Sequence, residues 1–370
     1  MNIVFVSNFL NHHQIPFCEK MIELCDNFNF IATQAGGRQG YQTTTDAPYV
    51  INYNSENKNK VENMIESADA VIFGACPNEL IDLRMRENKL SFLYSERFLK
   101  KGLWRRFIPT TRKKIKDRIV KYENKNMYVL CASAYLSYEL SLFNFPVEKC
   151  FKWGYFPECK NYDIDELISN KTQNSILWCA RLIDWKHPEI PVLVAEKLKS
   201  LNIDFKLNII GTGALEDEIK SMIKEKNLDD CIEMIGSMPP EEVRKNMEKS
   251  QIFLMTSDRQ EGWGAVLNEA MNSACAVIAN KAAGAVPYLI KNGKNGFAYT
   301  KCDIDDICEK IVELFNDKEK MKSVQEQAYY TISNVWNLKV AAERLIKLSN
   351  AILNGEQSPD LFEDGICSKS

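Results

Sequence analysis

The sequence has few histidines and no paired cysteines, which limits the metal sites that it can build. It contains 3 histidines and 12 cysteines in 370 residues, and no two cysteines form a CxxC pair. Zinc sites of the common kinds need Cys and His ligands at close spacings, so we expect no metal in this protein. Most cysteines lie in apolar runs such as "MYVLCAS" (127–133), where we expect them to pack as small buried hydrophobic residues.

Long apolar runs and a leader pattern are also missing. Nowhere do 18 consecutive apolar residues occur, and "MNIVFVSN" begins as a strand, without a basic segment or a cleavage site. The net charge of -3 provides no general attraction for nucleic acid. Hydrophobic residues make up 45% and charged residues 26%, as in a globular protein of about two domains. We expect a cytoplasmic protein that binds no nucleic acid.

The sequence does contain a regular alternation of short β-branched or aromatic runs with helix-period segments. This alternation is typical of parallel sheets that are covered by helices on both faces. We expect an α/β fold with two Rossmann-like doubly wound domains that face each other across a cleft. The expected strands are 2–7, 28–33, 69–74, 90–95, 127–133, 175–180, 205–211, 231–236, 251–257 and 275–280.

The alternation is interrupted at residues 154–174, which are rich in Gly, Pro, Asn and acidic residues. We place a linker there, between a domain at 1–153 and a second domain at 175–335. A helix at 336–353 is expected to return toward the first domain, and residues 354–370 are expected to form a loose polar tail. In open parallel sheets, ligands bind beyond the carboxyl ends of the strands, so functional residues should follow strands directly.

Three features of the second domain follow expected strands. Two cations stand five positions apart after the first strand, two glycines follow the next one, and "EGWGAVLNEA" (261–270) follows 251–257. Glycines ahead of a helix let a phosphate approach free N–H groups, and two cations can stabilise a departing diphosphate. Taken singly, the features also fit a tight turn, a solvated surface pair and helix-end charges. Their shared position after neighbouring strands favours a single site.

The order and spacing of these segments resemble the GT-B glycosyltransferases of family 4, which are retaining nucleotide-sugar enzymes. "ARLIDWKHPE" (180–189) is similar to the family's G-R-L-x-x-x-K-G, "IIGTGALEDEIK" (209–220) to its G-x-G turn, and "EGWGAVLNEAM" (261–271) to its E-G-F-G-x-x-x-x-E-A-M. Two later segments, 279–299 and 335–348, also resemble family elements. The resemblance covers residues 175–350, whereas the first half resembles the family in architecture more than in motif.

The resemblance implies a role for each matching residue. Arg181 and Lys186 would hold the donor's diphosphate as it leaves, and Glu261 would bond the sugar hydroxyls, so these three form the catalytic set. Paired contacts between a carboxylate and a diol are charge-assisted and directional, and Glu269 would bond the ribose in this way. The backbone amides of Gly264, Ala265 and Val266 would lie against the phosphates. The residues that would bind the donor are Gly211, Gly213, Gly264, Ala265, Val266 and Glu269.

The implied activity is a retaining transfer of a hexosyl or related sugar to a hydroxyl group. The donor would be a nucleotide sugar, with UDP- or GDP-sugars expected, and no cofactor or metal would take part. The acceptor would be a saccharide or a lipid-linked saccharide, in the synthesis of bacterial surface polysaccharide or glycoconjugate.

The sequence departs from the family pattern at several positions. Ala180 replaces the glycine before the arginine, Ala285 replaces the second glycine of G-G-x-P-E, and Tyr288 replaces its glutamate. The glycine-rich loop after the first strand is replaced by "SNFLNHHQIPF" (7–17). The change at Tyr288 leaves the donor sugar open.

The first domain offers three acceptor-side candidates, namely Asn8, His13 and Glu96. Asn8, His12 and His13 follow the first strand, where a histidine could equally cap or pack beneath the next helix. Glu96 follows another strand in "SERF", where it could contact the acceptor or form an ion pair with Arg97 or another neighbour.

Residues 100–121 form a basic segment with ten Lys or Arg against one Asp, interleaved with Trp104, Phe107 and Ile108. A solvated helix face explains such a segment. Peripheral docking on anionic lipid at the inner face of the cell membrane also explains it, since each basic residue near such a surface is worth about 1 kcal/mol.

Other functions stay open at this point. A nucleotide-sugar epimerase on the same scaffold would need acid and base groups such as Glu96 and His13, and would act without an acceptor. A non-catalytic nucleotide-sugar-binding protein would bind without turnover. A glycosidase built on Glu261 and Glu269 fits poorly, because these carboxylates flank a helix start and do not face each other across a bond.

Overall fold

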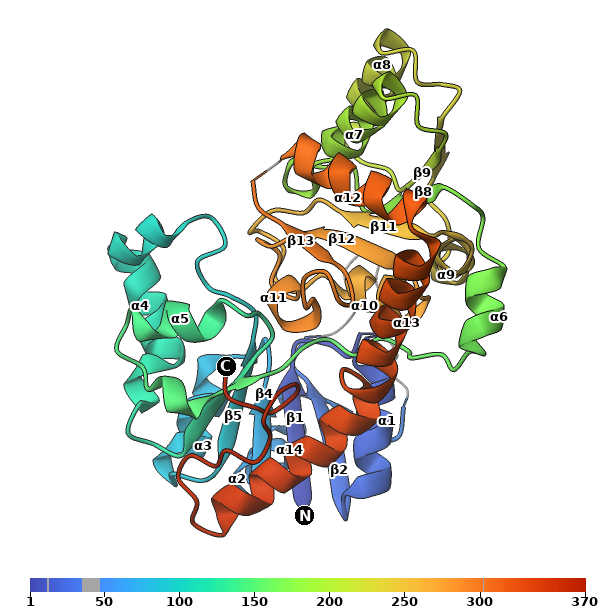
Figure 1. Ribbon diagram of the computed structural model, residues 1–370. Coiled ribbons are helices and arrows are strands. Elements are labelled where there is room, and N and C mark those ends of the chain that lie inside the picture. Colours follow the sequence, from blue (N-terminus) through green and yellow to red (C-terminus); the bar gives the residue numbers. More distant parts are fainter. Residues whose placement is uncertain (12, 35–46, 302) are drawn as a thin grey trace. The chain divides into compact units, whose positions relative to one another are not determined.

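The computed structural model describes residues 1–11, 13–34, 47–301 and 303–370 (Figure 1). The chain divides into two compact units, one made of residues 1–158 with 336–370 and the other of residues 159–335. The predicted fold class is confirmed, because each unit is a Rossmann-like α/β layer structure built on a parallel sheet. His12, part of the expected acceptor loop, lies outside the described residues.

The sheet of the first unit has seven strands in the order β3-β2-β1-β4-β5-β6-β7, and each neighbouring pair is parallel. The strand order reverses between β1 and β4, which is where doubly wound folds open a crevice at the carboxyl ends of the strands. Five strands lie where the alternation predicts them, whereas β3 and β7 are missed because three residues are too few to show a period. The strands are β1 (Asn2–Ser7), β2 (Asn27–Ala32), β3 (Val50–Asn52), β4 (Ala70–Phe73), β5 (Ser91–Ser95), β6 (Met127–Cys131) and β7 (Cys150–Lys152).

Both faces of this sheet are covered, because successive side chains of a strand point to opposite sides. Val4 and Val6 of β1 pack on one face in a cluster with residues of α2 to α5, whereas Phe5 packs on the other face against Phe30. Helix α14 lies beside α1 (Figure 1). The helices are α1 (Ile15–Leu24), α2 (Lys58–Ser67), α3 (Asn78–Arg86), α4 (Pro109–Arg118), α5 (Leu136–Ser141) and α14 (Leu338–Leu353).

The C-terminal tail is not loose, which corrects the expectation for residues 354–370. Ile366 and Cys367 are buried, and Lys369 forms an antiparallel bridge with Phe151 of β7. The amide N–H of Lys152 donates to the carbonyl of Ser368 over 2.8 Å. The tail is polar in composition, but its few apolar side chains and its backbone cover the edge of β7, a contact that composition cannot reveal.

The sheet of the second unit has six parallel strands in the order β10-β9-β8-β11-β12-β13, with the reversal between β8 and β11. Five strands follow the predicted alternation, and the three-residue β13 is again missed. The strands are β8 (Ser175–Cys179), β9 (Lys206–Ile210), β10 (Ile232–Gly236), β11 (Ile252–Met255), β12 (Ala276–Asn280) and β13 (Phe297–Tyr299).

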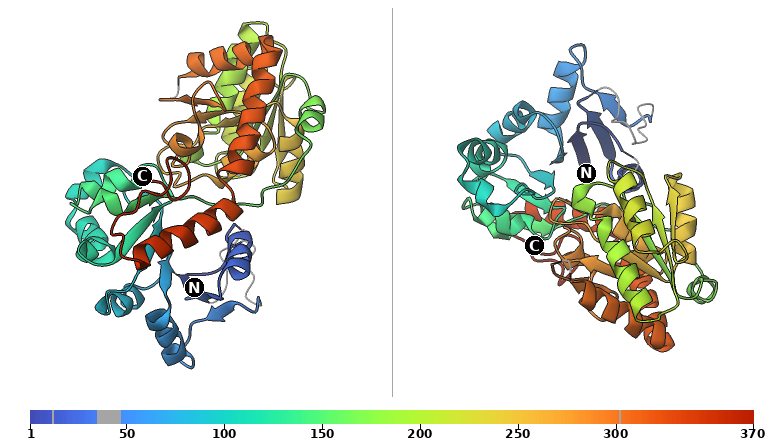
Figure 2. Two further views of the ribbon diagram at one scale, coloured as in Figure 1. Left: turned by 60° about the horizontal axis from the view of Figure 1, so that its bottom comes forward. Right: turned by 90° about the horizontal axis from the view of Figure 1, so that it is seen from above.

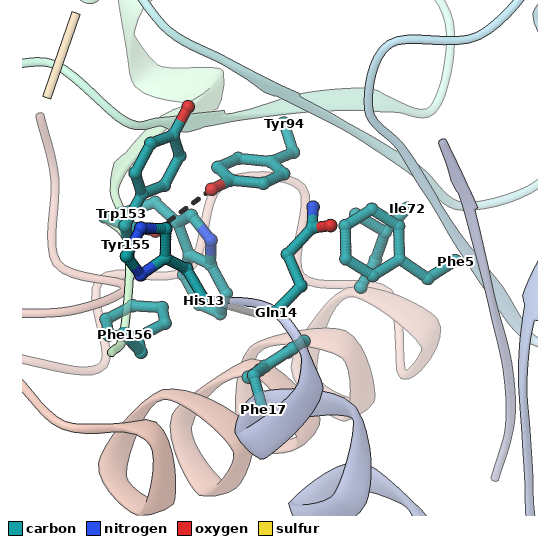
Figure 3. A pocket seen from close by; sticks show the side chains of 10 residues that line it. Phe5, His13, Gln14, Phe17, Ile72, Tyr94, Trp153, Tyr155 and Phe156 are labelled. Carbon is teal, nitrogen blue, oxygen red and sulfur yellow. Dashed lines mark hydrogen bonds between the residues drawn. The ribbon is translucent and has the colours of Figure 1, made fainter. Parts of the chain in front are cut away.

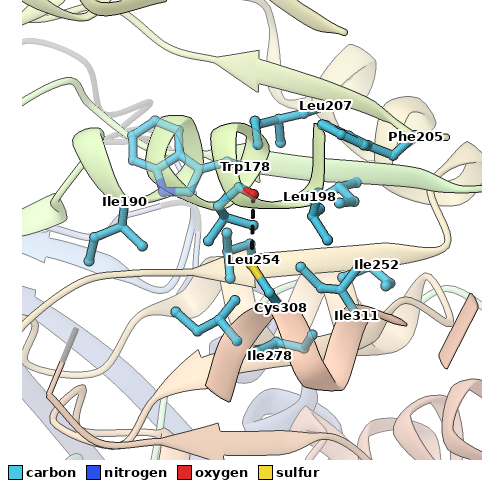
Figure 4. Packing of buried hydrophobic residues seen from close by; sticks show 14 of the residues in the cluster. Trp178, Ile190, Leu198, Phe205, Leu207, Ile252, Leu254, Ile278, Cys308 and Ile311 are labelled. Atoms are coloured by element: carbon cyan, nitrogen blue, oxygen red, sulfur yellow. Dashed lines mark hydrogen bonds between the residues drawn. The ribbon is translucent and has the colours of Figure 1, made fainter. Parts of the chain in front are cut away.

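Helices α7, α8 and α12 bury their apolar sides on one face of this sheet, around residues such as Trp178 and Leu254 (Figure 4). Helix α10 packs against α9 and α13. Figure 2 shows the sheets and helices from two further sides. The helices are α6 (Ile164–Ser169), α7 (Glu189–Ser200), α8 (Glu216–Glu225), α9 (Pro240–Lys249), α10 (Ala265–Asn272), α11 (Val286–Leu289), α12 (Ile304–Asn316) and α13 (Lys318–Asn334).

The segment placed in the linker by composition is largely attached to the second unit, which begins at Cys159. Lys171 is buried, and its Nζ donates to the carbonyls of Met247, Glu248, Ser250 and Ser273 over 2.8 to 3.1 Å. These carbonyls lie at the carboxyl ends of α9 and α10, where a cation is favoured. Within the described ranges, no helix is long and apolar enough to cross a membrane.

Candidate functional site

The loops after β8 and β11 are joined to each other at the carboxyl edge of the second sheet. The N–H of Asp258 donates to the carbonyl of Trp185 over 2.9 Å, and the Thr256 hydroxyl donates to the carbonyl of Lys186. Thr256 in turn accepts a hydrogen bond from the buried indole N–H of Trp178 over 2.7 Å. The two segments that carry the expected catalytic residues are therefore held side by side by backbone and core contacts.

Lys186 and Glu261 form an ion pair across these loops, 75 positions apart in the chain. The two side chains are only 11% and 12% exposed, so the pair is largely shielded from water. The Lys186 ammonium also lies 4.5 Å from the ring centroid of Trp185, and the Arg181 guanidinium lies 5.7 Å from the same ring. Two cations thus lie at the Trp185 ring, and one of them is paired with a carboxylate. Trp185 was not predicted from the sequence, although it stands between both cations.

Helix α10 begins beside this cluster with unsatisfied donors. Gly264 precedes the helix with a φ of 100° and offers no capping side chain, so the first N–H groups at Ala265 and Val266 have no intrahelical acceptor. Glycine suits this position because its φ of 100° lies in the left-handed region, which residues with a Cβ atom rarely adopt. The positive end of the helix therefore faces the loop that carries Glu261.

Glu269 lies within α10, close to the end of β8. Burial raises the pKa of its carboxyl, although the charge of Arg244 opposes the shift. Burial also raises the pKa of the nearby Cys179 thiol to about 12, and both Glu269 and Lys186 influence it. In the described part of the chain, the Glu269 carboxylate has no ion pair or side-chain hydrogen bond, so it is available to an external donor.

Gly211 and Gly213 are glycines because two loops approach each other closely at these positions. A Cβ atom on Gly211 would lie 1.9 Å from the carbonyl oxygen of Ala180, and one on Gly213 would lie 2.2 Å from that of Leu182. The Leu182 N–H donates to the carbonyl of Thr212 over 3.0 Å. Both glycines therefore let the loop after β9 press against the loop that carries Arg181, in addition to the phosphate contact that the resemblance implies.

The loop after β12 is attached to the same site. The N–H groups of Gly284 and Ala285 donate to the carbonyls of Glu261 and Trp263 over 3.2 and 3.1 Å. The Tyr288 ring lies 6.2 Å from the buried ring of Trp263. Two of the departures from the family pattern, Ala285 and Tyr288, thus lie next to the segment that begins at Glu261.

In the first unit, His13 and Glu96 are brought together through Tyr155. The His13 ring is stacked on Tyr155 with a centroid distance of 6.5 Å, and the Tyr155 hydroxyl donates to Glu96 over 2.7 Å. His13 and Tyr155 line an aromatic pocket beside β1, with Gln14 reaching in toward its centre (Figure 3). Asn8 follows β1 directly but is not among the residues that line this pocket. Tyr155 gave no signal in the sequence because it falls within the expected linker.

Glu96 forms an ion pair with Lys100, one of the neighbours that the sequence left open. Arg97 instead pairs with Glu139 over 3.0 Å, and both side chains are buried. The same glutamate accepts from the Leu99 N–H over 2.8 Å. Arg97 therefore anchors the loop after β5, whereas Glu96 remains on the side of the Tyr155 pocket.

No group of three or more His, Cys, Asp or Glu side chains in the described ranges is placed to hold a metal ion.

Comparisons with known proteins point to one class of enzyme. Residues 160–331 match the family described as Glycosyl transferases group 1. The chain is 25% identical over 282 residues to the amylovoran biosynthesis glycosyltransferase AmsK of Erwinia amylovora, covering 74% of this chain and 67% of that protein. It is 26% identical over 179 residues to the putative colanic acid biosynthesis glycosyltransferase WcaL of Salmonella typhimurium, covering 47% and 44%. The match thus spans less than half of WcaL.

A solved structure shows the same fold over nearly the whole chain. The crystal structure of Anabaena Alr3699/HepE in complex with UDP has a TM-score of 0.72 at 15% identity, covering 95% of this chain and 100% of that one. The family match and the names of the relatives support a glycosyltransferase with the GT-B fold.

Proposed function

We propose that this protein is a retaining glycosyltransferase of family 4 that transfers a sugar from a nucleoside diphosphate to an acceptor hydroxyl. The observation that carries this proposal is the cluster of Arg181, Lys186 and Glu261 beside the open amino end of α10. It joins two cations for a diphosphate to a carboxylate for sugar hydroxyls, within the segment that matches the glycosyltransferase family.

In the proposed reaction, the bond between the anomeric carbon and the diphosphate oxygen breaks, and the acceptor oxygen bonds to that carbon from the same face. The leaving diphosphate takes the proton of the acceptor hydroxyl. Arg181, Lys186 and the α10 amides stabilise the charge that grows on the diphosphate, the kind of electrostatic effect that lowers a barrier most. Glu269 binds the ribose. The proposed reaction uses no cofactor and no metal, and the proposed donor is a UDP- or GDP-sugar.

The proposed acceptor is a saccharide or lipid-linked saccharide of bacterial surface polysaccharide synthesis. The relatives AmsK and WcaL are named for amylovoran and colanic acid biosynthesis, which supports this class. In the first unit, Asn8, His13 and Glu96 are the candidates for contacting the acceptor. An epimerase or a non-catalytic binding protein is not favoured, because the matched relatives are glycosyltransferases.

A two-step experiment tests the proposed reaction. A thermal-shift screen with UDP-, GDP-, ADP- and CMP-sugars identifies the donor, since a ligand at 100 times its Kd adds about 2.7 kcal/mol of stability. Turnover of that donor is then expected to fall about 100-fold in Lys186→Ala and in Glu261→Ala. Lys199→Ala, which removes a surface pair with Asp230, is the control and should keep its rate. Near-normal turnover in Lys186→Ala would remove that residue from the mechanism.

We also propose that the basic segment 100–121 docks on anionic lipid at the cytoplasmic face of the membrane. Trp104 and Phe107 are 61% and 68% exposed on one 3₁₀ turn, Leu103–Phe107. Arg105 and Arg106 lie over these rings at 5.9 and 4.7 Å. Exposed aromatic rings beside arginines suit the boundary between lipid headgroups and acyl chains.

A flotation assay with vesicles of phosphatidylglycerol and phosphatidylcholine tests this docking. We expect the protein to float with acidic vesicles, and the double variant Trp104→Ser with Phe107→Ser to lose most of its binding. A matched change of Leu201→Ser, another exposed apolar residue, should bind as before. Absence of flotation by the unaltered protein would contradict membrane docking and leave the transferase proposal untouched.

A further inference from the structure

The Glu261 side chain lies where an anion would be expected. Its carboxylate pairs with Lys186. A Cβ atom on Gly264 would lie 3.3 Å from Cγ and 3.7 Å from Cδ of Glu261, so this side chain lies along the amino end of α10. The pair of groups that would receive a phosphate, a lysine and a helix start, is therefore already neutralised by a carboxylate of the same chain.

A phosphate that enters this site has to take Lys186 away from Glu261. The Glu261 side chain is 12% exposed, and its backbone is held by hydrogen bonds from its N–H to Asp258 and from Gly284 to its carbonyl. The carboxylate cannot easily turn into bulk water from this position. A charge that is buried and loses its partner is strongly destabilising unless new hydrogen bonds replace the partner.

We infer that Glu261 is the residue that makes the site discriminate between the nucleotide sugar and the nucleoside diphosphate that remains after transfer. This inference rests on the proposed function. The intact donor releases Lys186 to its phosphates and offers sugar hydroxyls that donate to Glu261. The product offers the phosphates alone, so Glu261 returns to Lys186 and weakens the hold on the diphosphate.

The lysine has a second contact that keeps it ready for this exchange. Its ammonium lies 4.5 Å from the Trp185 ring centroid, and the backbone carbonyl of Lys186 accepts a hydrogen bond from the Thr256 hydroxyl. The exchange therefore needs only a movement of the carboxylate relative to the ammonium.

Binding of UDP and GDP to Glu261→Gln, measured by calorimetry, tests the inference. Glutamine keeps the shape of the Glu261 side chain but cannot neutralise Lys186. We therefore expect the variant protein to bind the preferred diphosphate about tenfold tighter, which corresponds to about 1.4 kcal/mol. The same variant should be inhibited more strongly by the diphosphate product during turnover. The matched control is Glu196→Gln, which breaks another Lys–Glu pair of this unit, that with Lys226, and should bind as the unaltered protein does.

Each outcome of the calorimetry decides something. Tighter diphosphate binding by Glu261→Gln and by Glu261→Ala, lost when Lys186→Met is added, supports the exchange. Equal or weaker diphosphate binding in both variants, with the control unchanged, overturns it while the transferase proposal stands. If the unaltered protein binds neither UDP, GDP nor any sugar derivative of them, the proposed function itself fails. Circular dichroism melts show that the variants are folded.

Discussion

At the scale of single residues, the second unit places charged groups in positions where water is scarce. Glu269 is the clearest case, because burial raises the pKa of its carboxyl and Arg244 only partly offsets this shift. A carboxyl with a raised pKa in the folded state stabilises the fold less as the pH rises through that pKa. This destabilisation occurs at the position where, in the proposed function, an ionised carboxylate binds the ribose.

The raised pKa of Glu269 predicts how diphosphate binding depends on pH. Binding needs the ionised carboxylate, so affinity should fall as the pH is lowered from neutral, starting above the usual range of a glutamate. Glu269→Gln should bind weakly at every pH and lack this decline. Calorimetry from pH 5 to 8 checks this. The ratio of the two proteins' affinities at each pH removes the contribution of the phosphate's own titration.

The control for this pH series is Glu233→Gln, an exposed glutamate of β10 in the same unit. It should follow the unaltered protein throughout. A decline of equal size in Glu269→Gln would show that another group causes the pH dependence.

At the scale of elements, the site is an assembly of loops that touch through their backbones. The loop after β9 meets the loop after β8 where Gly213 faces Leu182. The loop after β11 meets the loops after β8 and β12 through Trp185 and Gly284. Each loop is short and continues into a helix. The positions of Arg181 and Lys186 therefore depend on packing by the neighbouring loops.

Gly213→Ala tests this dependence. A Cβ atom would fall 2.2 Å from the Leu182 carbonyl oxygen, so the loop that carries Arg181 and Lys186 has to shift. We expect a loss of stability of about 1–3 kcal/mol, as for other overpacking changes, together with weaker diphosphate binding. Thermal melts with and without UDP or GDP measure both effects.

Gly293→Ala provides the comparison, because this glycine has a φ of 76° and no atom within 4 Å of its missing Cβ. Its free energy of unfolding should fall only by the cost of placing alanine in a left-handed backbone conformation, about 1–2 kcal/mol. Its diphosphate binding should be unchanged. If Gly213→Ala binds diphosphate normally, the contact between the two loops does not position the cations.

At the scale of the whole molecule, the chain builds one unit from a continuous segment and the other from two pieces. Residues 159–335 contain a complete six-stranded sheet with its own core. Residues 1–158 depend on 336–370 for α14, which packs beside α1, and for the tail that covers β7. The two units should therefore respond differently when the chain is cut.

We expect the fragment 159–335 to fold alone and to bind the preferred nucleoside diphosphate. A fragment that starts at 175, where the composition changes, lacks Lys171 and leaves four carbonyls without their shared donor. The carbonyls of Met247 and Ser250 keep a second donor in Cys275, whereas a buried carbonyl that loses its partner costs about 1–3 kcal/mol. The shorter fragment should therefore melt at a lower temperature. Circular dichroism melts compare the two. Equal melting temperatures would mean that residues 159–174 add nothing to this unit.

The sequence by itself determined the alternation of strands and helices, because a buried parallel strand and a covering helix each have a local period in their side chains. It also predicted Lys186 and Glu261 as site residues, because residues that follow parallel strands lie at one edge of the sheet. The strands β3, β7 and β13 were not predicted, because three residues are too few to show a side-chain period. These strands form only by pairing with their neighbours in the sheet.

Only the tertiary structure decided which partners these residues have. The pairing of Lys186 with Glu261 and the link from His13 through Tyr155 to Glu96 join positions far apart in the chain. The packed tail follows the same rule, because its contact with β7 depends on backbone groups that every residue type possesses. Such contacts arise from the meeting of distant loops, which leaves no periodic trace in the sequence.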